Sequence, residues 1–559
     1  SGLPSLHSIG AGDQVTEEQM LALFGEGKHP DATAMEKKRV AELVADGASK
    51  KDATLLALRE TKLGNPFRIH AGVTEFRKAV GEAFADHNAA HGLPAHAAID
   101  DDVRSQIRTD IAREMFHSEL GRDPLDDREL SGWVAKNSRA KTTAVAGYDV
   151  TFSPVKSVSA LWALAPREMS EAIEAAHHDA VADALDWFEN NALLTRLGTD
   201  GVQQVDTEGM LAAAFTHRDS RAGEPDLHTH VAISNKVKVK GQDKWLAVDG
   251  RPLHKAMAAI SETYNTRLEG YLRERLGVDF AERAGTDPNK RPIREIVGVD
   301  ADLAARWSSR AGMIDIRRGE LAAEFQRELG REPTPVEARK LNQRANLETR
   351  EAKHEPRSLA EQRAAWRSEA IEVLGTERAL SEMIRRTTHD HGGVRTAATV
   401  DAQWISESAD RALAVVSESR ARWQEWHVRA EAARIVRSES VPSAEMERAI
   451  TAVTEAALEP QRSVSLGPVE ELDEPEILRR SNGASVYTTE GTRLYTSEAI
   501  LAAEDRLVQA AQLGGGRSVD ALTVDLALLE HAANNFDLHT SQAQMVRELA
   551  TSGDRLQLA

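Results

Sequence analysis

The stretch FTHRDSRAGEPDLHTHVAIS, residues 215–234, carries the strongest structural signal in the chain. His228 and His230 are two residues apart, and on a β-strand side chains at this spacing share one face about 7 Å apart. The residues that alternate with them then face the core: Leu227, Thr229, Val231 and Ile233. The polar segment 220–226 contains glycine and proline and reads as a hairpin loop after a partner strand at 211–215. This hairpin would bring His217 beside the other two histidines.

Three histidines at one point are a metal-ligand geometry. Neutral imidazoles leave coordination positions open on a divalent ion, where substrate oxygens can bind and be polarised. The chain has no cysteine, so any metal must use nitrogen or oxygen ligands. We therefore expect a divalent ion (Mg²⁺, Mn²⁺ or Zn²⁺) on His217, His228 and His230. The alternative is that they are ordinary polar residues of an exposed hairpin.

A second predicted strand, residues 145–152, places Asp149 and Thr151 on one face. If this is the histidine face, the Asp149 carboxylate could orient a histidine or accept a proton. If the histidines are disregarded, the alternative that Asp149 is an aspartate at a strand edge with no chemical role is about as reasonable as this one.

The residues that follow this strand read as a helix start. Ser153 is the expected N-cap and Pro154 the first helical residue. Free backbone N–H groups at residues 155–157 could bind a phosphate oxygen, and Lys156 could add positive charge.

The bulk properties limit the classes of protein. A chain of 559 residues with 41% hydrophobic residues is a globular protein of several domains. No apolar run is long enough to span a bilayer and the first residues do not resemble a signal peptide, so we expect a soluble protein without membrane insertion. The net charge of -19 argues mildly against nucleic acid, although basic clusters occur at 236–244, 290–294 and 339–357. Any one of these clusters is more often a solvated face.

The order of predicted elements gives an α+β fold, an antiparallel sheet flanked by helices. Thr16 and Gln19 form a capping box for an early helix, and residues 332–335 start a later one. Further predicted segments are helices over 50–140, 168–190 and 300–458, strands over 202–205 and 227–238, a linker over 466–474, a hairpin-like run at 485–487 and 493–495, and two helices in the tail.

The segment GYDVTFSPVKSVS (147–159), with FTHRDSR (215–221) and LHTH (227–230), resembles the MobF class of conjugative relaxases, the TrwC/TraI-like proteins. These enzymes nick one strand of plasmid DNA at the transfer origin. The resemblance implies a histidine-hydrophobe-histidine (HUH) palm with a helical fingers region and a mostly helical C-terminal extension. It also implies that His217, His228 and His230 bind the metal and that Asp149 serves the catalytic tyrosine.

The resemblance implies partners as well. These are single-stranded DNA of the transfer origin, accessory relaxosome proteins and the coupling protein of type IV secretion, in a bacterial cytoplasm. The fingers would grip DNA near residues 347–353. The expected DNA-binding residues are Ser153, Lys156, Ser157, Arg218, Arg221, Lys236, Arg350 and Lys353.

The expected domains are a relaxase domain over 1–360 with a helical insertion at about 50–140, a helical region over 361–465, and a linker with the start of a helicase-like domain over 466–559. No G-x-x-x-x-G-K loop followed by Ser or Thr occurs, so ATP hydrolysis is not expected. Family nucleophiles are tyrosines upstream of the segment matching residues 10–20, and the chain has none there. We therefore expect binding of metal and single-stranded DNA without a covalent 5'-phosphotyrosine adduct.

Two other readings stay open. The first is a non-catalytic, metal-assisted module that binds single-stranded DNA. The second is a metal hydrolase or three-histidine oxygenase unrelated to DNA, against which the basic clusters and the long helical segments count.

Overall fold

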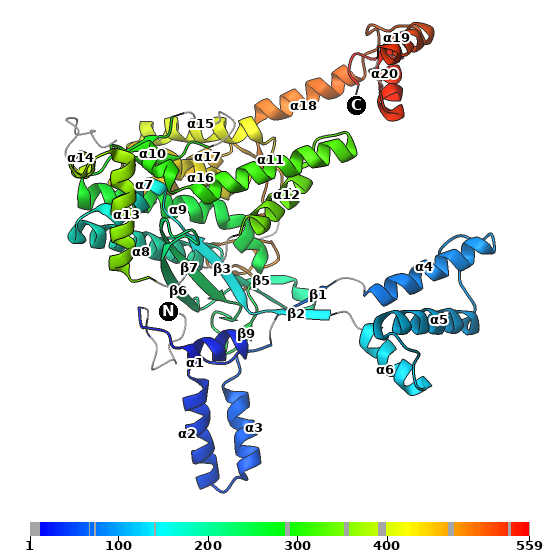
Figure 1. The fold of residues 1–559 in the computed structure, drawn as a ribbon, viewed down its shortest axis with the longest axis horizontal. Helices are drawn as coiled ribbons and strands as arrows, with labels where there is room; N and C mark the ends of the chain where they lie inside the picture. Colours follow the sequence, from blue (N-terminus) through cyan, green and yellow to red (C-terminus); the bar gives the residue numbers. More distant parts are fainter. Residues whose placement is uncertain are drawn as a thin grey trace. The chain divides into compact units, whose positions relative to one another are not determined.

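A computed structural model describes residues 10, 12–65, 67–71, 74–138, 141–284, 291–350, 357–388, 399–467, 474–534 and 538–557. Helices dominate and the sheets are small, which confirms the α+β class (Figure 1). The chain divides into two compact units. The first comprises Ser1–Val150, Leu194–Phe215 and His230–Asp249, and the second comprises Thr151–Leu193, Thr216–Thr229 and Gly250–Ala559.

A three-stranded sheet carries the predicted histidine hairpin. Its order is β3 (Gly147–Phe152), β7 (Pro225–Ser234), β6 (Ala212–Asp219), and each strand contributes residues to both units. Burial alternates along β7 as predicted, with Leu227, Thr229, Val231 and Ile233 buried and both histidines half-buried. Strand β6 extends beyond the predicted 211–215, so His217 lies within the strand.

The first unit begins with α1 (Glu17–Met20), which has the predicted Thr16–Gln19 capping box and continues as the π-helix η1 (Leu21–Gly25). The predicted helical region 50–140 is confirmed, except that it also contains the strand β1 (Phe67–Ala71). A small core of aromatic residues, Phe76, Phe116 and Trp133, holds its last three helices together. The helices that follow η1 in the first unit are α2 (Ala32–Ala45), α3 (Lys50–Glu60), α4 (Glu75–Ala90), α5 (Asp101–Leu120) and α6 (Asp127–Ser138).

The strand predicted over 145–152 is confirmed as β3 over 147–152, but its predicted start is wrong. Val145 is the last residue of a separate strand, β2 (Lys141–Val145), which pairs antiparallel with β1, and β3 starts after Ala146. Gly147 marks the change of partner: a Cβ there would lie 2.4 Å from the Ile233 carbonyl oxygen, a close approach that only glycine permits.

The strand predicted to run to residue 238 ends at Ser234. The Asn235 side chain takes the place of ladder bonds, since its amide donates to the Val145 carbonyl (2.8 Å) and accepts from the Val248 N–H (2.8 Å). The chain resumes in the short hairpin β8 (Val237–Lys238) and β9 (Trp245–Leu246). A further antiparallel pair, β4 (Leu194–Leu197) with β5 (Gln203–Asp206), completes this unit.

The second unit is built on helices. Helix α7 (Lys156–Leu164), which is buried from Ser157 onward, packs together with the long α8 (Arg167–Asn191) and α9 (Gly250–Leu276). Strand β10 (Phe280–Glu282) pairs with β11 (Arg294–Ile296). Thr334 caps α12 as predicted, with Pro335 in the first turn. The remaining helices up to residue 458 are α10 (Ala301–Arg306), α11 (Ser309–Leu329), α12 (Pro335–Glu348), α13 (Leu359–Leu374), α14 (Glu377–Thr388), α15 (Ala402–Ser419), α16 (Glu425–Ser438) and α17 (Ser443–Leu458).

The tail differs from its prediction. Strand β13 (Tyr495–Thr496) pairs with β12 (Val464–Ser465), and Tyr495 also exchanges backbone bonds with Trp423, so the hairpin with residues 485–487 is wrong. Three helices follow instead of two: α18 (Glu498–Ala511), α19 (Ala521–Ala533) and α20 (Thr540–Thr551). Most of the predicted linker, residues 468–473, lies outside the described residues. Among the described helices, none is both long and apolar enough to cross a membrane.

Candidate metal centre

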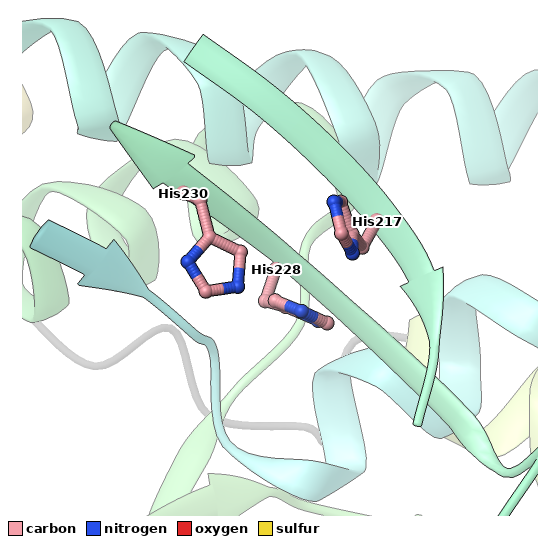
Figure 2. Close-up of side chains that lie close together, drawn as sticks. All are labelled: His217, His228 and His230. Atoms are coloured by element: carbon pink, nitrogen blue, oxygen red, sulfur yellow. The ribbon is translucent and has the colours of Figure 1, made fainter. Parts of the chain in front are cut away.

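The three predicted histidines do converge. His217 lies on β6 and His228 and His230 lie on β7, and one ring nitrogen of each lies within 4.8 Å of the others (Figure 2). The rings of His217 and His228 are 5.1 Å apart between centroids. His217 is exposed, so one side of the cluster is open to a substrate.

The Nδ1 atoms of two histidines are occupied by oxygen acceptors. His228 Nδ1 lies 2.7 Å from the Asp226 carbonyl oxygen, and His230 Nδ1 lies 3.0 and 3.1 Å from the two Asp149 carboxylate oxygens. A carbonyl or carboxylate oxygen accepts, so each Nδ1 is assigned as the donor, and Nε2 is the nitrogen that the neutral ring would offer to a metal. This is the arrangement in which metal-binding histidines are held by partners behind them.

Asp149 is thus beside the cluster, on the histidine face, which is the first of the two possibilities that the sequence left open. Its side chain is 63% exposed, which leaves carboxylate oxygen surface facing solvent while it accepts from His230. The contact with His230 is of the kind by which a carboxylate orients a metal-binding histidine.

The donor set fits a divalent metal ion. Bonds of about 2.0 to 2.1 Å from zinc to imidazole nitrogen place two ligands of one ion about 4 Å apart at most. The cluster, with its nitrogens within 4.8 Å, therefore needs only a small inward rotation of the rings. Within the part of the chain that the structure describes, no other group of histidine and carboxylate side chains has this geometry.

A buried histidine behind the strand was missed by the sequence analysis. His177 on α8 is fully buried, with Nε2 2.7 Å from Thr229 Oγ1 and Nδ1 2.9 Å from the Tyr264 hydroxyl. Burial, with smaller contributions from His178 and His228, lowers the pKa of His177 to about 3. The only sequence signal was the His177–His178 pair in an amphipathic helix.

The hairpin loop between the ligand strands is also held from behind. Glu224 is buried and accepts from the Ser309 backbone N–H (3.1 Å) at the start of α11. The Trp366 indole donates to the Gly223 carbonyl (2.7 Å) and the Gln362 amide donates to Asp219 (2.8 Å), both from α13. These contacts join residues more than eighty positions apart in the chain, and no local pattern indicates them.

The predicted helix start after β3 is wrong. Helix α7 begins at Lys156 with Val155 as N-cap and no side-chain cap, so the exposed Ser153 is not the capping residue. The backbone N–H of Ser157 donates to Glu295 (3.1 Å) and its hydroxyl also bonds to Glu295. A carboxylate from β11 therefore occupies the position expected for a phosphate.

Two lysines expected to bind DNA have partners inside the protein. Lys156 Nζ lies 3.0 Å from the Pro225 carbonyl and 3.2 Å from Asp226. Lys236 is only 4% exposed and lies against the Gly64 carbonyl at 3.5 Å, and burial lowers its pKa. Both ammonium groups thus have protein partners, and the DNA-binding role expected of these two lysines stays a prediction.

The arginines are placed differently. Arg218 is exposed and pairs with Glu174 at 3.3 Å, Arg221 is half-buried, and Arg350 is exposed just after α12. Lys353 lies outside the described residues. Among the eight expected DNA-binding residues, Ser153, Arg218 and Arg350 are the exposed ones within the described part.

Two tyrosines, the buried Tyr264 and the half-buried Tyr271, have hydroxyls that bond to other side chains of the second unit. Tyr264 is 2% exposed and burial raises the pKa of its hydroxyl well above its usual range. The Tyr271 hydroxyl donates to Asp183 (2.6 Å), and burial together with Asp183 raises its pKa to about 12. Both lie on α9.

Known proteins resemble this chain. Residues 2–373 match the TrwC relaxase family. The multifunctional conjugation protein TraI of Escherichia coli K12 is 30% identical over 248 residues, which cover 41% of this chain and 13% of that protein. A second TraI from Escherichia coli is 33% identical over 180 residues, 29% of this chain and 10% of that protein. The match thus spans a small part of the length of these curated relatives.

Solved structures of the conjugative relaxase TrwC are also similar. One, a metal-free complex with oriT DNA, is 23% identical, with a TM-score of 0.34 and coverage of 56% of this chain and 99% of that chain. Another, complexed with a 27-mer DNA comprising the recognition hairpin and the cleavage site, is 24% identical, with a TM-score of 0.34 and the same coverage.

Proposed function

This chain belongs to the TrwC relaxase family, and on that premise we propose that it binds one DNA strand at a plasmid transfer origin and takes part in nicking it. The activity is a metal-dependent transesterification, specific for one site and one strand. The single observation that carries the proposal is the cluster of His217, His228 and His230, whose ligand atoms lie within 4.8 Å of one another.

The three histidines would hold a divalent ion of the Mg²⁺, Mn²⁺ or Zn²⁺ class. When bound, such an ion neutralises negative charge on the non-bridging oxygens of the scissile phosphate. The protein's part is to present one ring nitrogen of each histidine on one side of a sheet, and Asp149 and the Asp226 carbonyl fix two of these rings by accepting their Nδ1–H groups.

The bond changes of the nick balance without ATP. A tyrosine oxygen forms a bond to phosphorus, the bond from phosphorus to the 3' oxygen breaks, and the 3' oxygen takes up a proton. The attacking hydroxyl must lose its proton, and the exposed Asp149 carboxylate is the proposed acceptor beside the histidine cluster. Tyr264 and Tyr271 are not the nucleophile in this proposal, because their hydroxyls bond to His177 and Asp183 inside the protein.

The proposed DNA contacts are Arg218, Arg221 and Arg350, with Ser153 at the edge of the sheet. Lys353 remains a proposal from the family resemblance. Relaxosome accessory proteins and a type IV secretion coupling protein are proposed partners. The proposed domains are the relaxase domain over 1–360, the helical region over 361–465 and the start of a helicase-like domain over 466–559.

The test is binding of fluorescent single-stranded oligonucleotides that tile the transfer origin of the plasmid that encodes the chain. Fluorescence anisotropy is measured with and without MnCl₂, for the unmodified chain and for His228→Ala. We expect one oligonucleotide to bind more tightly with Mn²⁺, and His228→Ala to abolish this gain. Binding that is the same in both proteins, with the same salt dependence, would instead identify a DNA-binding module without a metal-centred site.

A further inference from the structure

Thr229 lies between the two ligands on β7 and faces the opposite side of the strand. It is 1% exposed. A hydrophobic residue would fill this position without further requirement, whereas a buried hydroxyl must find hydrogen-bond partners. Thr229 Oγ1 has two, His177 Nε2 at 2.7 Å and Thr216 Oγ1 at 3.1 Å.

These contacts belong to a continuous series of hydrogen-bonded side chains that runs from the buried Tyr264, His177 and Thr229 to the exposed Thr216 and His178. The Tyr264 hydroxyl bonds to His177 Nδ1 at 2.9 Å, and at the other end Thr216 Oγ1 bonds to His178 Nε2 at 3.0 Å. A neutral His177 has one N–H and one lone pair, so it can donate to one neighbour and accept from the other. The hydroxyls of Tyr264, Thr229 and Thr216 then each have a hydrogen-bond partner, whichever of the two His177 nitrogens carries the hydrogen.

The ring of His177 has little freedom to leave this position. It stands edge-on to the Tyr264 ring, at 89° and 5.7 Å between centroids, and Tyr264 in turn packs against Phe152 at 5.3 Å. The low pKa of His177 keeps it neutral, and therefore both donor and acceptor, at ordinary pH.

The two threonines occupy equivalent places beside the ligands. Thr216 directly precedes His217 on β6, and Thr229 directly follows His228 on β7. A bond between the two hydroxyls therefore fixes the register of the strands next to the ligand on each one. A slip of one residue would turn the ligand side chains to the other face of the sheet.

We propose that Thr229 and His177 are positioning residues of the metal centre, which set the strand register that brings His217 to His228. This inference rests on the proposed metal-dependent function. It gives Thr229, the residue between the two ligands on β7, a role that depends on its hydroxyl and that a hydrophobic side chain could not perform.

The test compares Thr229→Val, which keeps the shape and removes the hydroxyl, with Thr229→Ser, which keeps the hydroxyl. The matched control is Thr454→Val on α17, because Thr454 is also buried and its hydroxyl bonds only to the Ile450 carbonyl (2.7 Å). For each protein, Mn²⁺ affinity is measured by calorimetry, the thermal midpoint is measured without metal, and the Cu²⁺ complex is examined by electron paramagnetic resonance.

We expect Thr229→Val to bind Mn²⁺ about tenfold more weakly, the lower end of the effect of partners behind metal ligands, and to show altered copper hyperfine splitting. Thr229→Ser should bind within about twofold of the unmodified chain, and Thr454→Val should lower the thermal midpoint without changing metal affinity. Unchanged Mn²⁺ affinity and copper spectrum in folded Thr229→Val would overturn the proposal and reduce the contact to a structural one.

Two further outcomes are separable. If Thr229→Val does not fold, His177→Gln, whose amide can still donate to Thr229, is compared with His177→Leu, and equal Mn²⁺ affinity of these two overturns the proposal. If the unmodified chain does not bind Mn²⁺, the metal-dependent function fails together with this inference, whereas a failure of positioning alone leaves Mn²⁺ binding by the unmodified chain intact.

Discussion

Replacing Asp149 by alanine should weaken metal binding through His230. The carboxylate lies 3.0 Å from His230 Nδ1 and is its acceptor, so it fixes both the ring orientation and the hydrogen on Nδ1. Loss of such a partner typically costs 10- to 100-fold in metal affinity. Because the Asp149 side chain is 63% exposed, water can replace it as an acceptor, which places the effect near the lower end. We expect a loss of about tenfold, or about 1.4 kcal/mol.

The assay is calorimetric titration with MnCl₂ at pH 7.5 on the folded, metal-free chain. Asp149→Asn should fall between the alanine variant and the unmodified chain, because its amide oxygen still accepts from Nδ1–H. Asp243→Ala is the matched control: its carboxylate is 95% exposed and lies 3.6 Å from Lys238, away from the histidines in sequence. Mn²⁺ affinity of Asp149→Ala within twofold of the unmodified chain would refute the role of the carboxylate.

Three further predictions concern the supports of the site. Burial lowers the pKa of His177 to about 3, so as the pH falls below about 6.5 this histidine is protonated in the unfolded state but not in the folded state. Protonation of the unfolded state should therefore lower the free energy of unfolding by about 3 kcal/mol between pH 7 and pH 4. Urea unfolding should therefore show a smaller acid destabilisation for His177→Gln, and equal losses would contradict the argument. Tyr264→Phe should lower the free energy of unfolding by about 1 to 2 kcal/mol, because His177 loses a buried hydrogen-bond partner. Mass spectrometry of trapped adducts should find no DNA on Tyr264, and a DNA-linked Tyr264 peptide would be the contrary result. Glu224→Ala should raise the rate of amide hydrogen exchange at Ser309 and in the first turn of α11, since the Ser309 backbone N–H loses its acceptor. Unchanged exchange would show that the Glu224 carboxylate does not stabilise the start of this helix.

The local pattern of the sequence was sufficient for the hairpin. Alternation with a period of two placed His228 and His230 on one face, and the turn residues brought His217 to them, because both depend only on neighbours along the chain. The same parity rule placed Asp149 and Thr151 on one face of their strand but left open whether this was the histidine face. The contact of Asp149 with His230 in the structure answers that question.

The errors arose where distant residues decide the outcome. Ser153 and Pro154 have the local features of a helix start, yet α7 begins at Lys156, and Glu295 accepts from Ser157, 138 positions away. Lys236 looked like part of a basic surface because its neighbours in sequence are basic, but its side chain is buried against Gly64. Tertiary packing overrides local patterns in these cases, and a single sequence carries no sign of it.

His177 shows the same limit for the functional site. Nothing in the helix that contains it distinguishes a histidine that supports a ligand strand from one that fills a core. Its partners Thr229 and Tyr264 are 52 and 87 positions away. Only their meeting in the fold gives the residue a role.

The central claim, a divalent ion held by His217, His228 and His230, is tested most directly by anomalous X-ray scattering from crystals soaked in MnCl₂. We expect one peak about 2.1 Å from one ring nitrogen of each of the three histidines, with Asp149 still accepting from His230 Nδ1. Manganese peaks that lie only elsewhere, or a peak bound through His230 Nδ1 with Asp149 displaced, would contradict the account.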